Sequence, residues 1–397
     1  MALRFSLDAQ RTEAAAGAAV AGAALLGFAL ANSPEAHRYF TLIGMDFTVR
    51  IGAFSETMSR GAWIRHGLMA LYFFVIGLEL KQEVLRGELS SPRRLALPAL
   101  AALGGMVVPI LLCLALTWRG GGSDGAWPVA AANDGVIALA VLSLVGRGLP
   151  QSLKVFLQAM TVAGQLAVSV LIALLYTGQI HTWPLAGAAL ALMGLIALSE
   201  WKDAPFLFRS LGYLLLWGFV LKSGIDTALA GLAAALTVPG TGRRPGHEAA
   251  LRNYLRTLKP YVDFAVLPLF ALTAAGIPVA GAPLWAAAPL ALTTALVLGK
   301  PAGVIAATFI AIRMGLARRP TGASWLELWG LAALAGSPLV IGLFLSGLAF
   351  PPPDPGASGS TLAVMAAATV SAGVGALALG ASAAQRRRLR PEIDEAA

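Results

Sequence analysis

The sequence predicts an all-α polytopic membrane protein of about twelve transmembrane helices. The prediction depends on the composition, on the recurrence of long apolar stretches and on the placement of the basic residues. Hydrophobic residues make up 57% of the 397 residues, charged residues make up only 12%, and the mean hydropathy is +0.75. A soluble protein carries about 25% charged residues. A chain of this length would need several soluble domains, and there are too few charges here to cover them.

Apolar stretches long enough to cross a membrane recur along the whole chain. A transmembrane helix needs about 20 mostly apolar residues to cross a hydrocarbon core of about 30 Å. Such stretches lie at 13–31, 61–85, 95–117, 128–146, 152–176, 183–200, 206–220, 221–238, 261–278, 284–311, 325–350 and 360–382. The boundary near residue 220 is the weakest, because 206–238 is almost continuously apolar, so eleven or thirteen spans stay open.

The formal net charge of +9 is explained by membrane topology rather than by nucleic-acid binding. If both termini are cytoplasmic, the basic residues outside are only Arg38, Arg50, Arg60, Arg65 and Arg119. Lys222 and Lys300 fall within spans, and every other Lys and Arg falls in a cytoplasmic segment. This asymmetry follows the positive-inside rule and predicts a multi-pass protein of the bacterial inner membrane with no nucleic-acid partner.

The loops predict one transmembrane domain over 1–397 with few accessory elements. Residues 47–54 alternate apolar and polar side chains, which is typical of a small external β-hairpin. The turn residues that open 239–260 indicate a cytoplasmic linker, and the charged tail 383–397 is expected to be disordered. The single cysteine, Cys113, excludes an intramolecular disulfide.

Two of the predicted spans are interrupted by polar or helix-breaking residues. Asn133-Asp134-Gly135 interrupts the fourth span, and Gly336-Ser337-Pro338 interrupts the eleventh. Proline removes a backbone donor and clashes with the preceding turn. Paired interruptions in the two halves of a transporter point to a binding site near the membrane midplane, although a simple kink in each helix stays an alternative.

Ionisable residues within the spans are the candidate functional residues, because charge at membrane depth is costly. Asp134 lies beside the break, where it could cap a half-helix or bind a cation or proton. Lys300 is either a structural counter-charge or a proton carrier. Lys222 and Asp226 are four residues apart and could pair on one helix face. Glu79 and Glu83, beside Lys81, are either a solvated helix end or a pH-sensing group.

At these residues the chain resembles the NhaA family of sodium/proton antiporters. The resemblance is carried by Gly77-Leu-Glu-Leu-Lys-Gln-Glu-Val-Leu-Arg-Gly-Glu-Leu89, Ala131-Ala-Asn-Asp134, Leu153-Lys-Val-Phe-Leu157, Leu221-Lys-Ser-Gly224, Pro268-Leu-Phe270 and Gly299-Lys-Pro301. It runs in collinear order from Asn32 to Phe350.

The resemblance implies a fold of inverted repeats in which helices four and eleven are broken and cross at the midplane. It implies export of sodium or lithium in exchange for protons, without a cofactor, and a homodimer formed through the external segment 47–54. It assigns Asp134 and Lys300 to compensation of the half-helix dipoles. Glu79 and Glu83 would belong to a cytoplasmic funnel and to the pH response.

The sequence departs from the family pattern at the ion site itself. The family carries two adjacent aspartates on helix five, where this chain has Gly164 and Gln165. Gln165 can offer an amide oxygen to sodium but cannot titrate, and Asn133 stands where the family has threonine. Because the aspartate that the family pattern places near Lys300 is absent, Asp226 is proposed as its partner.

Two functions therefore stay open on the sequence alone. The first is Na⁺/H⁺ exchange through Asp134 and one further acid. The second is the same fold with lost or altered exchange, either a transporter of another small solute or a non-transporting membrane subunit. An enzyme is not expected, because the chain contains no HExxH or GxSxG motif.

Overall fold

The computed structural model describes residues 2–52, 54–87, 91–118, 125–201, 206–240, 247–282, 285–351, 354 and 356–395. Across these ranges the regular structure is helical except for one β-hairpin. The hairpin pairs β1 (Asp46–Ile51) with β2 (Phe54–Ser59) in antiparallel register, with Thr48 opposite Thr57. The predicted hairpin is therefore present, and it is longer at both ends than the predicted segment 47–54.

Helical segments follow one another in the positions of the twelve predicted spans. They are α1 (Ala2–Ala31), α3 (Arg60–Trp63) with η1 (Ile64–Leu68) and α4 (Met69–Arg86), α5 (Pro92–Thr117), α6 (Trp127–Ala130) with α7 (Val136–Val145), α8 (Gln151–Leu175), α9 (Thr182–Glu200), α10 (Phe206–Ser223), α11 (Thr227–Thr237), α12 (His247–Tyr261) with η3 (Val262–Val266) and α13 (Leu267–Ala274), α14 (Ala287–Thr294) with η4 (Ala295–Gly299) and α15 (Lys300–Arg313), α16 (Trp325–Ala335) with α17 (Leu339–Ala349), and α18 (Gly356–Glu395). A short helix, α2 (Ala36–Gly44), precedes the hairpin. The all-α polytopic architecture is thus confirmed.

Seven helices in the described ranges are long and apolar enough, by length and composition, to cross a membrane: Gln10–Ala31, Arg94–Thr117, Gln151–Leu175, Thr182–Glu200, Ala287–Arg313, Trp325–Ala349 and Gly356–Arg388. Val136–Val145 and Thr227–Thr237 are shorter apolar helices. Large apolar side chains such as Leu111, Leu174 and Leu377 are more than half exposed, as expected for side chains that face lipid.

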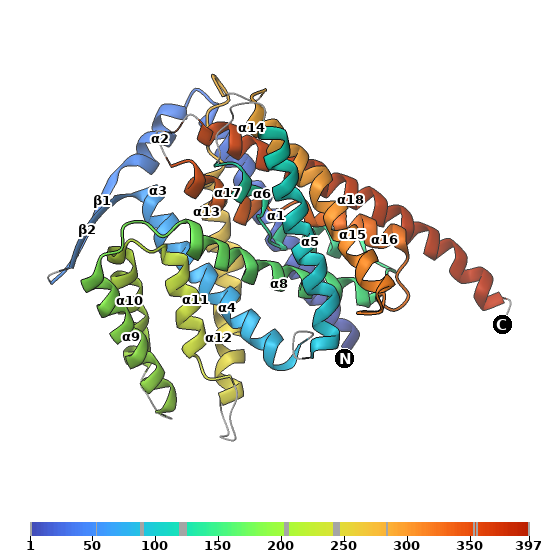
Figure 1. The fold of residues 1–397 in the computed structure, drawn as a ribbon, viewed down its shortest axis with the longest axis horizontal. Helices are drawn as coiled ribbons and strands as arrows, with labels where there is room; N and C mark the ends of the chain where they lie inside the picture. The colour runs from blue at the N-terminus through green and yellow to red at the C-terminus, as the bar shows by residue number, and fades with distance from the viewer. Residues whose placement is uncertain are drawn as a thin grey trace.

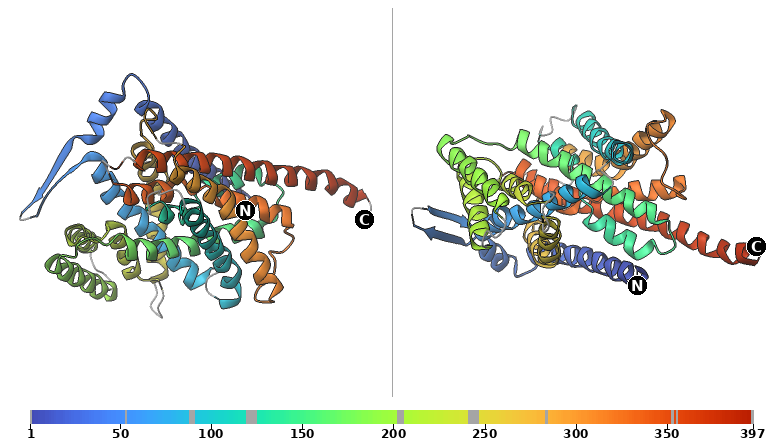
Figure 2. Two further views of the ribbon diagram at one scale, coloured as in Figure 1. Left: turned by 45° about the horizontal axis from the view of Figure 1, so that its top comes forward. Right: turned by 90° about the horizontal axis from the view of Figure 1, so that it is seen from below.

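The two chain ends lie toward the same side of the molecule, and the hairpin projects from the body at the opposite side (Figure 1). We call the side that carries the start of α1 and the end of α18 the terminal face. The side that carries α2 and the hairpin is called the hairpin face. Two further views show both the hairpin and the last turns of α18 extending beyond the helical body (Figure 2).

Close packing of small residues brings several helices together. A Cβ atom on Gly104 of α5 would lie 2.4 Å from the carbonyl oxygen of Gly303 on α15, and one on Gly303 would lie 2.1 Å from that of Gly104. Small residues are enriched where transmembrane helices approach closely. In the middle of the bundle, Phe344 of α17 packs against Phe73 of α4 and Phe270 of α13, with ring centroids 5.6 and 6.2 Å apart.

Three details of the predicted organisation need correction. The break in 206–238 falls at 224–226 rather than near 220, because Gly224 adopts a φ of 84° and ends α10. Residues 247–260 of the predicted linker form α12, whose Leu251 and Leu255 are buried, while 241–246 lie outside the described residues. A disordered tail was predicted from 383, but α18 continues to Glu395. Near the start of this predicted tail, Arg386 bonds Glu327 of α16.

Candidate functional site

The site is formed where two helices are interrupted. The fourth segment is non-helical from 131 to 135, between α6 and α7, and the eleventh is non-helical from 336 to 338, between α16 and α17. Gly135 is the N-cap of α7, Gly336 is the C-cap of α16, and Pro338 is the N-cap of α17. Both predicted breaks are therefore present. The two interrupted helices contact each other, since α17 touches α6 and α7 and α16 touches α7.

Asp134 joins the two breaks through its carboxylate. The backbone N–H of Val136, in the first turn of α7, donates to Oδ1 at 3.2 Å, and that of Ile341, in the first turn of α17, donates to Oδ2 at 2.9 Å. Asp134 is only 2% exposed. The first N–H groups of a helix have no partner within it, and the dipole places about half a positive charge there. A single carboxylate thus balances two half-helix N-termini.

The side chain of Lys300 lies at the C-terminal end of a half-helix, where the helix dipole is negative rather than positive. Its ammonium group donates to the carbonyl oxygen of Ala132, which follows the short helix α6. Lys300 is 1% exposed and stands directly after the π-helical segment η4. A cation is favourable where the carbonyl groups of a helix end are free. Asp134 and Lys300 also interact electrostatically.

Asn133 occupies the space that a side chain at position 164 would need. Its Nδ2 donates to the carbonyl oxygen of Thr161 on α8 at 3.1 Å. A Cβ atom on Gly164 would lie 2.1 Å from that same Nδ2 and 2.6 Å from Cγ. The amide of Asn133 therefore rests on the bare backbone of Gly164, and the two residues fit each other sterically.

Gln165 lies one residue further along α8 and is also buried. Its Nε2 donates to the hydroxyl oxygen of Tyr72 on α4 at 3.4 Å. Within the described part of the chain, the side-chain oxygens of Asn133 and Gln165 accept no hydrogen bond. The site therefore holds one carboxylate, one ammonium and two amide oxygens. The carboxylate and amide oxygens are hard ligands suited to a hard cation. Tyr72 was not singled out from the sequence, because an isolated tyrosine in an apolar span has no distinctive pattern.

Asp226 is not the partner of Lys300. It is the N-cap of α11, where its Oδ1 accepts a hydrogen bond from the backbone N–H of Ala228 at 2.8 Å, and its charge interacts with Arg65. Lys222 does not pair with Asp226 either, because α10 ends between them. It forms an ion pair with Glu56 of the hairpin and donates to the carbonyl oxygen of Ser55. The turn at Gly224 separates Lys222 from Asp226 and leaves Asp226 as the cap of α11.

A second charged group lies near the terminal face. Glu79 of α4 accepts from Lys259 of α12 at 2.7 Å, and Lys259 is 3.6 Å from Asp263 of η3. Glu83 lines a surface pocket with Gln82, Gly240 and Arg252. Lys259 and Asp263 were missed in the sequence, since nothing in their local pattern links them to α4. In the described part of the chain, no three His, Cys, Asp or Glu residues could hold a metal ion together.

Comparisons with known proteins agree with this architecture. The family model described as Na⁺/H⁺ antiporter 1 matches residues 8–379. A Rhodospirillum rubrum protein named Na(+)/H(+) antiporter NhaA is 39% identical over 355 residues, which cover 87% of this chain and 88% of that protein.

Two further relatives extend the match. A protein of Pseudomonas savastanoi pv. phaseolicola named Na(+)/H(+) antiporter NhaA 2 is 40% identical, with 85% of each chain covered. One of Novosphingobium aromaticivorans with the same name is 39% identical and covers 94% of this chain and 95% of its own. Together with the two broken helices joined at Asp134, these matches show that the chain belongs to the NhaA family of Na⁺/H⁺ antiporters.

Proposed function

We propose that this protein is a secondary antiporter that exports Na⁺ or Li⁺ in exchange for H⁺. The observation that carries the proposal is the buried carboxylate of Asp134 between the two half-helix N-termini. Family membership supports the same activity. Ionisable residues at membrane depth typically mark ion pathways and proton relays.

The proposed site binds the cation through oxygen atoms from the break between α6 and α7 and from the neighbouring helix α8. Asp134 supplies the charged ligand, and the amide oxygens of Asn133 and Gln165, which accept no described hydrogen bond, supply neutral ligands. Sodium and a proton then compete for the Asp134 carboxylate, and this competition couples their movements. Lys300 balances the carbonyl end after α6 and keeps the charge of the empty site low.

The proposed orientation places the terminal face in the cytoplasm of the bacterial cell, with the protein in the inner membrane. The support is the distribution of Lys and Arg, which favours this side. Single cysteines introduced at Gln385 and at Asp46 into a Cys113→Ala background test it. Only the Asp46 cysteine is expected to react with an impermeant thiol reagent added to whole cells; the reverse pattern would invert the topology.

We also propose that the protein forms a homodimer through the segment 47–54. The hairpin projects beyond the helical body (Figures 1 and 2), and its Phe47 is 55% exposed. Deleting the hairpin should convert a dimer into a monomer in light scattering of the purified protein. A dimer that persists without these residues would contradict the interface.

A role in the pH response is proposed for Glu79 and Glu83, which lie near the terminal face. Its support is the position of Glu79 within a cluster of three charges with Lys259 and Asp263. Replacing Glu79 by Gln should move the pH profile of exchange, whereas replacing the exposed Glu35 at the hairpin face should leave it in place. Equal profiles for both variants would remove the role.

The exchange itself is tested in proteoliposomes that contain a pH-sensitive dye. Addition of Na⁺ or Li⁺ should release or take up protons at some pH between about 6 and 9, a range in which histidines and perturbed carboxyl groups titrate. Asp134→Asn should abolish the signal, and Asp46→Asn, in the exposed hairpin, should retain it. No Na⁺- or Li⁺-dependent ΔpH for the unmodified protein would instead favour the same fold without this exchange.

A further inference from the structure

One face of α18 carries small and hydroxyl side chains from Ser360 to Ser382. Ser360, Ser371, Gly375 and Ser382 lie at spacings that place them on one side of a helix. Hydropathy alone makes α18 a twelfth span with a basic end. The contacts of this face show that it follows both halves of the interrupted helix α16/α17.

The contacts begin near the C-terminal end of α17. Ser346 of α17 is hydrogen-bonded to Ser360 at 2.6 Å and to Thr361 at 3.1 Å, and all three are buried. One turn earlier, a Cβ atom on Gly342 would lie 2.6 Å from a methyl group of Val364. The half-helix α17, which supplies the Ile341 N–H to Asp134, is thus held against the start of α18.

The contacts continue through the break and along α16. A Cβ atom on Gly336 would lie 2.6 Å from the hydroxyl oxygen of Ser371. One on Gly375 would lie 2.4 Å from Leu334, and one on Gly330 would lie 2.9 Å from Leu379. Glycines on both helices therefore allow an approach that a larger residue would permit only if neighbouring atoms shifted.

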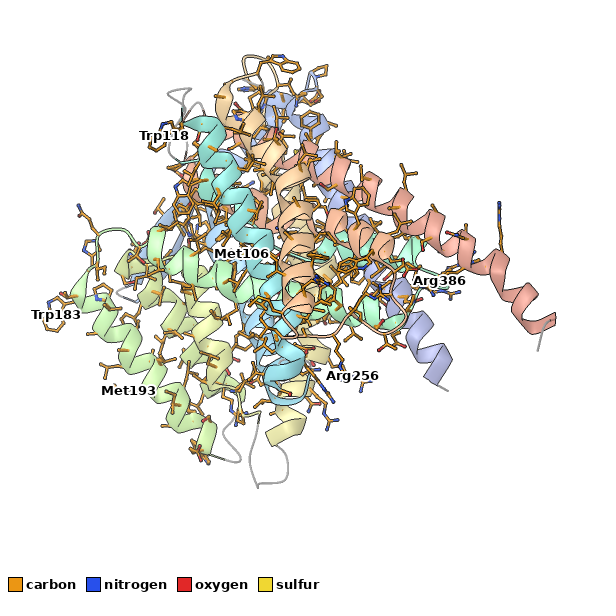
Figure 3. All side chains as sticks on the ribbon, turned by 45° about the vertical axis from the view of Figure 1, so that its right-hand side comes forward. Met106, Trp118, Trp183, Met193, Arg256 and Arg386 are labelled. Carbon is orange, nitrogen blue, oxygen red and sulfur yellow. The ribbon has the colours of Figure 1, made fainter. Side chains whose placement is uncertain are left out.

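An ion pair between a partly exposed arginine and a buried carboxylate closes the series at the terminal face. Arg386 of α18 donates from Nε to Oε1 of Glu327 at 2.5 Å and from Nη2 to Oε2 at 2.9 Å, and Ser382 donates to Oε1 at 2.8 Å. The Glu327 side chain is fully buried. It also closes the N-terminus of α16 in a capping box with Ser324. Figure 3 shows Arg386 where α18 leaves the helical body.

Arg386 and its neighbour reach further than α16. Arg386 also donates to the carbonyl oxygen of Gly322, at 2.6 Å, in the loop before α16. Arg387 donates to the carbonyl oxygen of Arg147, at 2.8 Å, directly after α7. The N-terminal end of α16 and the C-terminal end of α7 are therefore attached to consecutive arginines of α18. Each of these helices is one half of a broken helix.

We infer that Arg386 and Glu327 are positioning residues for ion exchange, which fix the half-helix α16 to α18 so that α16, α17 and α18 act as one body around the break. The part concerning exchange rests on the function proposed above. A planar guanidinium in a two-bond pair fixes direction as well as distance. Removing one partner leaves a buried charge unpaired, whereas removing both does not.

The experiment compares Arg386→Gln, Arg386→Lys, the double variant Arg386→Gln/Glu327→Gln, and Arg388→Gln. Arg388 is exposed and serves as the matched control. The first readout is hydrogen–deuterium exchange of residues 325–337 in the purified protein, which does not depend on transport. We expect faster exchange in Arg386→Gln, partial recovery in the double variant, and no change in Arg388→Gln.

The second readout is the Na⁺ concentration for half-maximal ΔpH and the pH profile in proteoliposomes. Arg386→Gln should raise that concentration about fivefold or more, the lower end of coupling between linked sites, and Arg386→Lys should recover part of it. Hydrogen–deuterium exchange that is the same in Arg386→Gln and Arg388→Gln would overturn the attachment. A lowered Tm with unchanged Na⁺ dependence and pH profile would overturn the positioning role. If neither the unmodified protein nor any variant transports Na⁺, the proposed function fails. Hydrogen–deuterium exchange still shows whether Arg386 fixes α16 to α18.

Discussion

Substitution of Gly164 by Ala tests the steric relation on which the site depends. The new methyl group would lie 2.1 Å from Asn133 Nδ2, whereas non-bonded atoms prefer about 3.5–4.0 Å. Asn133 must therefore move by more than an ångström and release the carbonyl oxygen of Thr161. Overpacking costs about 1–3 kcal/mol and the lost hydrogen bond about 1 kcal/mol. Alanine recovers about 1 kcal/mol of helix propensity, so the expected loss is about 1–3 kcal/mol.

A second substitution isolates the contact. Asn133→Thr shortens the side chain above position 164, so the double variant Asn133→Thr/Gly164→Ala should be more stable than the sum of the two single effects predicts. Residues in contact typically couple by about 0.5–3 kcal/mol. Gly194 of α9 is the matched control, because a Cβ atom there meets nothing within 4 Å. Gly194→Ala should be neutral or stabilising by about 0.5–1 kcal/mol.

The single buried cysteine provides the assay. Cys113 is the only cysteine of the chain and is inaccessible in the folded protein. A thiol-reactive dye should therefore label it only upon unfolding, and the labelling temperature gives Tm for each variant. The reasoning is refuted if Gly164→Ala unfolds at the same temperature as the unmodified protein and the double variant shows no coupling with Asn133→Thr.

Three further outcomes follow from the same structure. Replacing Gly164 and Gln165 together by Asp should support Na⁺-dependent ΔpH more strongly when Asn133→Thr is added, because the threonine leaves room for the new carboxylate; equal signals with and without Asn133→Thr would contradict this. Asp226→Ala should cost about 1 kcal/mol by removing the cap of α11, whereas Asp226→Asn should keep most of that stability in the dye assay. Gly224→Ala should lower Tm, because a residue at φ 84° is strained by a side chain and its Cβ atom would lie 2.2 Å from the carbonyl oxygen of Gln179; an unchanged Tm would contradict the described turn.

The sequence by itself determined the elements of the fold. Apolar stretches, turn residues and the two interruptions at 133–135 and 336–338 are local patterns, and each is visible within about twenty residues, which is the length needed to cross a membrane. The same local patterns misplaced the end of α10, because the αL turn at Gly224 is too short to interrupt an apolar run. They also hid α12 behind the turn residues that precede it.

Only the tertiary structure decided which side chains meet. Lys300 bonds the carbonyl oxygen of a residue 168 positions away, and the sequence had suggested Asp226 instead. In the sequence Arg386 is one basic residue of a charged tail, and only the structure brings it into contact with Glu327. Hydropathy places a residue at a depth in the membrane, but it contains no information on the direction in which a helix faces its neighbours. That direction is set by packing between helices, and it determines that Asn133 lies on Gly164 and that Asp134 closes both breaks.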